Sequence, residues 1–185
     1  MKRLLWILAG LLPLAGTAQT PAKRGFTSQI EMGVLLGQVS TDNNAPSSRT
    51  SFTASLFNGY RIFPALAAGI TVGADWYRTK TVIPLSVGLR GDFLRNAKVT
   101  PFYAIDVGKG MTWFMRDKTL TEQRGGWHIN PALGIRIATG GRSSITWSIG
   151  YKYQELYGRR DLSMDEYIAT DYHYNRMSLR MGMSF

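Results

Sequence analysis

The chain contains no cysteine, only two histidines and, beyond its first residues, no long apolar run. Without cysteine, no disulfide holds the fold and no thiol acts as a nucleophile or a ligand. Mean hydropathy is −0.12, and no later segment approaches the roughly 20 apolar residues that a helix needs to cross a bilayer. These absences exclude a disulfide scaffold and a bundle of membrane helices. They do not exclude a membrane β-barrel, because each of its strands is only half apolar.

The N-terminus has the order of a secretory signal peptide. Met1-Lys2-Arg3 is basic, Leu4 to Ala15 is apolar, and Gly16-Thr17-Ala18 supplies small side chains. We expect cleavage after Ala18, so that residues 1–18 are the signal peptide and residues 19–185 form one barrel domain. A membrane anchor or a buried helix is the alternative, and the lack of cysteine excludes a lipoprotein.

Charge is strongly unbalanced, with 22 Lys and Arg against 12 Asp and Glu, a formal net charge of +10. Removing Lys2 and Arg3 with the signal peptide leaves 10 − 2 = +8. Basic proteins often bind nucleic acid or an anionic surface. Secretion and the scattered placement of the charges argue against nucleic acid, so no nucleic-acid partner is expected.

Alternation of apolar and polar residues predicts eight strands, each long enough to cross the hydrocarbon at a tilt. The connections between them alternate between short turns and longer polar segments at 39–49, 113–125 and 158–171, which is typical of barrels with short periplasmic turns and longer outer loops. An even strand count then places both termini in the periplasm. The expected strands are 26–38, 50–62, 65–77, 82–95, 99–112, 126–139, 144–157 and 172–185.

One face of these strands is apolar and suits contact with lipid. Aromatic residues, Tyr77 among them, gather near the strand ends, where membrane proteins place their interfacial rings. Asn58 departs from the pattern by facing outward, and Phe57 and Phe102 depart from it by facing inward, so a bulge is a possible correction. The expected lipid face includes Ile30, Met32, Val34, Leu36, Ile70, Val72, Trp76, Leu85, Val87, Leu89, Ile129, Leu133, Ile135, Ile145, Trp147 and Ile149.

The opposite face carries charge, glycine, serine and threonine. An eight-stranded barrel is just wide enough for its own side chains, so charges inside it must pair. Glycines leave room for the long arginine side chains. We therefore expect a filled interior, whose excess of two bases needs carbonyls, water or anions. The predicted charge network is Glu31, Asp75, Asp92 and Asp106 with Arg61, Arg90, Arg136, Lys152, Arg176 and Arg180.

A soluble β-sandwich or lipocalin-like barrel is the alternative fold, because the same alternation supports it with the faces inverted. The long, even strands and the aromatic residues at both ends of the apolar face favour the membrane barrel. The fold class is thus all-β: a transmembrane, eight-stranded, antiparallel up-and-down β-barrel.

With these features the chain resembles the small bacterial outer-membrane β-barrels of the OmpA/OmpX type. The signal peptide, the eight strands and the final Met181-Gly182-Met183-Ser184-Phe185 carry the resemblance. It implies residence in the outer membrane and partnership with its lipids and assembly machinery. The expected assembly signal is Leu179, Met181, Met183 and Phe185.

No constellation in the sequence indicates catalysis, a cofactor or a metal. His128 and Asn130 superficially resemble part of the Ser-His-acid set of lipid A-modifying barrels, but the nearby serine is missing. Asp161, Asp165, Glu166 and Asp171 match no defined calcium loop.

The function expected from the sequence is therefore non-enzymatic. It is structural, or it is binding of an extracellular ligand or lipopolysaccharide through the outer loops. Their basic residues Arg78, Lys80, Arg116, Lys118, Arg124, Arg159 and Arg160 suit phosphate. A narrow porin-like channel and, less favoured, a lipid A-modifying enzyme are the alternatives.

Overall fold

The structure of the protein is a computed structural model that describes residues 24–41, 44–77, 81–94, 97–115, 122–141, 143–161 and 167–185. The expected signal peptide lies outside these residues. The strands are β1 (Gly25–Thr41), β2 (Asn44–Phe63), β3 (Leu66–Trp76), β4 (Thr81–Asp92), β5 (Val99–Met115), β6 (Glu122–Gly140), β7 (Ser143–Asp161) and β8 (Tyr167–Ser184).

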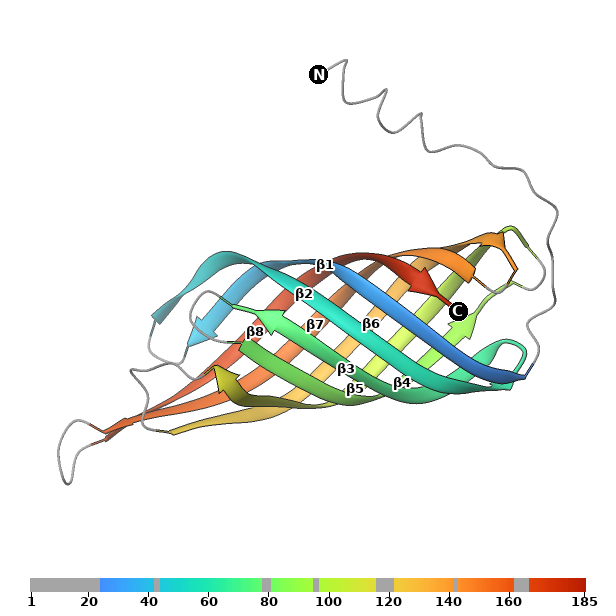
Figure 1. Cartoon of the computed structure of the whole chain (residues 1–185). Coiled ribbons are helices and arrows are strands. Elements are labelled where there is room, and N and C mark those ends of the chain that lie inside the picture. The colour runs from blue at the N-terminus through green and yellow to red at the C-terminus, as the bar shows by residue number, and fades with distance from the viewer. Residues whose placement is uncertain are drawn as a thin grey trace, which may run out of the picture.

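The strands form one closed barrel in sequence order, and every neighbouring pair is antiparallel (Figure 1). β8 pairs with β1 and closes the ring, from Gln29 opposite Ser184 to Thr41 opposite Tyr172. At the seam, Ser28 N donates to Phe185 O at 3.2 Å and Phe185 N donates to Ser28 O at 2.8 Å. The predicted eight-stranded up-and-down barrel is confirmed.

The two ends of the barrel differ. The turn end carries the connections β2–β3, β4–β5 and β6–β7, the start of β1 and the end of β8. The loop end carries the other four connections. Here the sequence prediction was partly wrong, because much of 39–49, 113–125 and 158–171 is strand. Thr41 pairs with Asn44, and Asp161 pairs with Tyr167. Residues 39–49 and 158–161 are mostly polar, so no apolar alternation marks these extensions as strand.

Alternation along each strand separates two surfaces. Apolar side chains point away from the barrel axis and form what we call the outer wall, where Ile70, Val87 and Leu133 are 57%, 66% and 58% exposed. Their strand neighbours Thr71, Ser86 and Ala132 point inward and are buried. In water such exposure of large apolar residues would be costly. The predicted orientation of the apolar face is confirmed.

Asn58 needs no bulge to explain its position. It lies opposite Ser28 on β1 and Ile70 on β3 in an uninterrupted register, and the nearest irregularity in the β2–β3 ladder falls between Arg61 and Phe63. Asn58 is exposed on the outer wall, while Phe57 is buried inside. The proposed bulge correction was therefore wrong. Within the described residues, no helix is long and apolar enough to cross a membrane.

Candidate functional site

The interior of the barrel holds a network of ion pairs in which Asp106 is the most fully surrounded carboxylate. Arg90 Nη1 lies 2.8 Å from Asp106 Oδ1, and the two side chains are 3% and 1% exposed. Thr71 Oγ1 donates to the same oxygen at 2.6 Å. A Cβ added at Gly88 would lie 2.7 Å from Asp106 Oδ1. Glycine at this position thus leaves space for the pair, as buried charges require close partners.

A second pair crosses the barrel. Lys152 Nζ on β7 lies 2.6 Å from the carboxylate of Asp75 on β3, and these strands are four positions apart in the ring of eight. Thr53 Oγ1 also donates to Asp75, at 2.7 Å. Because the two strands face each other across the axis, this pair spans the interior from one wall to the opposite one.

The third pair lies beside the closing seam. Arg180 Nη1 on β8 is 3.4 Å from Glu31 Oε2 on β1. Ser148 Oγ on β7 donates to the other oxygen of Glu31 at 2.8 Å. All three side chains are buried. Glu31 therefore links three consecutive strands across the point where the barrel closes.

Near the turn end, the Asp92 carboxylate forms ion pairs with two arginines. Arg61 Nη1 lies 2.9 Å from Asp92 Oδ2, and Arg136 Nη1 contacts Asp92 Oδ1. Arg61 also donates to the carbonyl of Pro64 at 3.1 Å. These side chains are 11–12% exposed, so solvent at this end screens the extra positive charge.

Arg176 accounts for the second base in excess. It is buried and donates to Ser51 Oγ at 2.7 Å. Its guanidinium carbon lies 4.8 Å from the ring centroid of Tyr77 and 5.3 Å from that of Tyr174. The faces of aromatic rings attract cations. The sequence prediction was that carbonyls, water or anions stabilise the two excess basic side chains. At Arg176, two tyrosine rings contribute to this stabilisation.

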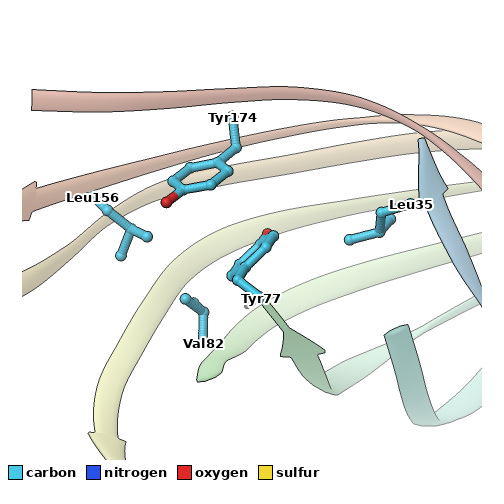
Figure 2. Packing of buried hydrophobic residues seen from close by; sticks show 5 residues of the cluster. All are labelled: Leu35, Tyr77, Val82, Leu156 and Tyr174. Atoms are coloured by element: carbon cyan, nitrogen blue, oxygen red, sulfur yellow. The ribbon is translucent and has the colours of Figure 1, made fainter. Parts of the chain in front are cut away.

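The same tyrosines belong to an apolar cluster inside the barrel, which we call the loop-end cap. Figure 2 shows Leu35, Tyr77, Val82, Leu156 and Tyr174 converging from five parts of the wall. The Tyr77 and Tyr174 rings are 4.7 Å apart. Tyr77 was expected in the outer aromatic ring, and this was wrong, because its side chain is only 8% exposed. Tyr77 lies two residues after the inward Asp75 and one after the outward Trp76, so its inward direction continues the alternation of β3.

The two histidines occupy different surfaces. His128 is buried inside the barrel at 3% exposure. His173 lies on the outer wall near the loop end, with Nδ1 3.1 Å from Tyr153 Oη, which donates to Glu155 Oε1 at 2.7 Å. In the part of the chain that the structure describes, no three His, Asp or Glu side chains are placed to hold a metal. Asp165 and Glu166 lie outside that part.

The remaining predicted residues fall into two groups. Leu179, Met181 and Met183 on β8, and Phe185 directly after it, all face outward, with 43–51% exposure. Among the basic loop residues, Arg124 and Arg159 lie on described strand extensions of β6 and β7, where they pair across the ladder with Tyr157 and Glu122. Arg78, Lys80, Arg116 and Lys118 lie outside the described residues, and so does the side chain of Arg160.

Comparison with known proteins supports the fold only. No family model and no curated protein matches the chain. Neisserial surface protein A is 13% identical, with a TM-score of 0.58 over 86% of this chain and 96% of its own. OprG of Pseudomonas aeruginosa is 9% identical, with a TM-score of 0.60 over 90% and 97%. The outer membrane protein AlkL is 12% identical, with a TM-score of 0.60 over 94% and 95%.

These likenesses and the closed ring of eight antiparallel strands define the class. The protein has the fold of the small outer-membrane β-barrels, in agreement with the OmpA/OmpX type that its sequence resembles.

Proposed function

We propose that the protein is a non-enzymatic, integral β-barrel of the bacterial outer membrane with a sealed, charge-paired interior. Its role is structural, or it binds partners through the loop end. The observation that carries this proposal is the inversion of the two surfaces. Large apolar side chains cover the outside, while buried Arg, Lys, Asp and Glu fill the inside. Such a distribution is stable only where the outside contacts lipid.

The sealed interior rests on two features described above. The Asp75–Lys152 pair spans the axis between opposite strands, and the loop-end cap packs apolar rings above it. A path for ions would have to break a buried ion pair and wet an apolar cluster. Both changes are unfavourable, so we favour the sealed barrel over the porin-like channel.

Orientation follows from the usual arrangement of this class of barrel. Short connections mark the periplasmic side, so the turn end and both termini would lie in the periplasm and the loop end outside the cell. Arg124 and Arg159 on the loop-end strand extensions carry charge that suits phosphates of lipopolysaccharide. The outer-membrane assembly machinery would recognise the outward-facing apolar residues at the C-terminus, which are Leu179, Met181, Met183 and Phe185.

Membrane fractionation of cells that produce the full chain tests location. We expect the protein in the outer-membrane fraction, with a faster gel band when the sample is not boiled. A short epitope inserted between Thr41 and Asn44 should be reached by antibody on intact cells, and an epitope after Phe185 should not. A soluble protein would contradict the proposal as a whole. The reverse pattern of epitopes would contradict the orientation alone.

A further inference from the structure

Asn58 and Ser28 form a polar pair on the outer wall near the turn end, while a second outward pair, Tyr151 Oη donating to Asn175 Oδ1 at 2.7 Å, lies nearer the loop end. Ser28 Oγ donates to Asn58 Oδ1 at 2.6 Å and lies 3.3 Å from the carbonyl of Phe57. The two residues are directly opposite each other on β1 and β2. Other polar side chains of the outer wall, such as Lys109 and Glu155, lie toward the loop end.

The pair lies below the aromatic ring of the turn end. Phe26 and Tyr60 form an edge-on contact with their centroids 5.5 Å apart, as interfacial aromatics do. Asn58 is two residues nearer the middle of β2. Strands rise about 3.3 Å per residue and tilt by about 40°, so Asn58 lies about 5 Å deeper than Tyr60. At that depth lipid acyl chains offer no hydrogen bond.

Ser28 satisfies only half of the Asn58 side chain. Within the described residues, no other donor or acceptor meets this amide. If the amide is turned the other way, its oxygen rather than its nitrogen faces the lipid, so one polar atom is left open in either case. A polar atom in hydrocarbon without a partner is costly, and polar residues in this setting commonly join neighbouring membrane segments.

We propose that Asn58 is the centre of an interface between two copies of this chain in the membrane. In a two-fold dimer of copies inserted in the same direction, the axis runs along the membrane normal, and an axis that passes beside Asn58 brings the two Asn58 side chains together. A carboxamide is self-complementary, since the N–H of one can donate to the oxygen of the other in both directions. The second copy thus supplies the hydrogen bonds that lipid cannot.

The surroundings of Asn58 suit such a contact. Leu56 and Ile70 flank it on β2 and β3 with 39% and 57% exposure, and Phe26 projects from β1 with 92% exposure. These side chains provide an apolar rim around a polar centre. The inference rests on the proposed membrane location, because in water the Asn58 amide would be hydrated.

Cross-linking in lipid vesicles tests the interface. Because the chain has no native cysteine, a single introduced cysteine is the only thiol that can react. Tyr60→Cys places a thiol beside Asn58, and Trp147→Cys on β7 is its control, since the native side chains are 46% and 45% exposed. With a short bis-maleimide, we expect several-fold more cross-linked dimer from Tyr60→Cys. Adding Asn58→Leu to Tyr60→Cys should reduce the yield to the control level.

Equal yields from the two cysteine variants, or a yield that Asn58→Leu leaves unchanged, would overturn the interface. Each variant is first checked for the faster unboiled band in the same vesicles. Failure of the unmodified chain to enter vesicles would overturn both the interface and the proposed membrane function. Insertion of all variants with equal cross-linking would overturn the interface alone.

Discussion

The outer wall and the interior are made by the same eight strands, yet they follow opposite rules. On the wall, Ile70 and Leu133 are exposed and apolar, while the neighbouring interior positions hold Thr71 and Ala132. A period of two lets one backbone face two environments. The wall needs only apolar bulk, which many residues provide. The interior needs specific partners, because each buried charge must meet an opposite charge or a ring.

The interior is itself divided along the barrel axis. At the turn end, the Arg61–Asp92–Arg136 group is partly exposed and tolerates a surplus of charge. At the loop end, Arg176 is buried and is held by Ser51 and the tyrosine rings. Substitutions should therefore have effects that depend on both surface and depth.

The largest effect is expected inside the barrel. Lys152→Met leaves the buried Asp75 carboxylate without its cation, which should lower the free energy of unfolding by about 3–5 kcal/mol. Urea unfolding of the protein in lipid vesicles measures the loss. The double variant Asp75→Asn, Lys152→Met is the control, since it removes both charges and should recover most of the stability. An unchanged stability in the single variant would contradict the cross-barrel pair.

The next effect is expected on the wall and depends on depth. Ile135→Arg places a charge in the middle of the apolar band and should cost about 2–4 kcal/mol, whereas Thr139→Arg, near the turn end of the same strand, should cost about 0–1 kcal/mol. Both native side chains belong to the outer face of β6. The same unfolding measurement compares them. Equal costs would mean that this face does not contact hydrocarbon.

A smaller effect is expected in the loop-end cap. Tyr77→Leu removes the ring that lies nearest the Arg176 guanidinium and should cost about 1–2 kcal/mol. Tyr77→Phe keeps the ring and loses only a long contact of 3.5 Å from its hydroxyl to Asp75. Near-native stability of the phenylalanine variant, measured beside the leucine variant, would assign the effect to the ring. Equal losses in both would assign it to the hydroxyl.

The smallest effect on stability is expected at the seam. Phe185→Ala keeps the two backbone hydrogen bonds to Ser28 and should change the unfolding free energy by less than about 1 kcal/mol. If Phe185 is part of an assembly signal, the same variant should nevertheless reach the outer membrane more slowly in a pulse-chase experiment. Phe93→Ala, another exposed phenylalanine at the turn end, is the control. Normal kinetics for Phe185→Ala would contradict the signal.

Much of the fold was predictable because the wall follows a simple rule. Alternation located all eight strands and their lipid-facing side, since burial in lipid demands apolar residues at every second position. Alternation failed at the loop end, where segments such as 39–49 consist mostly of polar residues. The strand pairs there, such as Thr41 with Asn44, depend on backbone hydrogen bonds that leave no pattern in the side chains.

The sequence predicted that the interior is charged, but it did not predict which charges pair with each other. The inward charges can be counted from the strands, but their partners depend on the closed ring. Lys152 meets Asp75 from the opposite side of the barrel, 77 residues away. Tyr77 enters the cap because it is in phase with the inward Asp75. The contact between its ring and Arg176 had no signal in the sequence, because it depends on how the strands close into a ring.

Single-channel recording of the purified, full-length barrel in a planar bilayer tests the sealed interior most directly. The Asp75–Lys152 pair and the loop-end cap together predict that inserted protein, verified by its faster unboiled band, conducts no sustained ion current. A stable and reproducible open channel in the unmodified protein would contradict the sealed interior and favour the porin-like alternative.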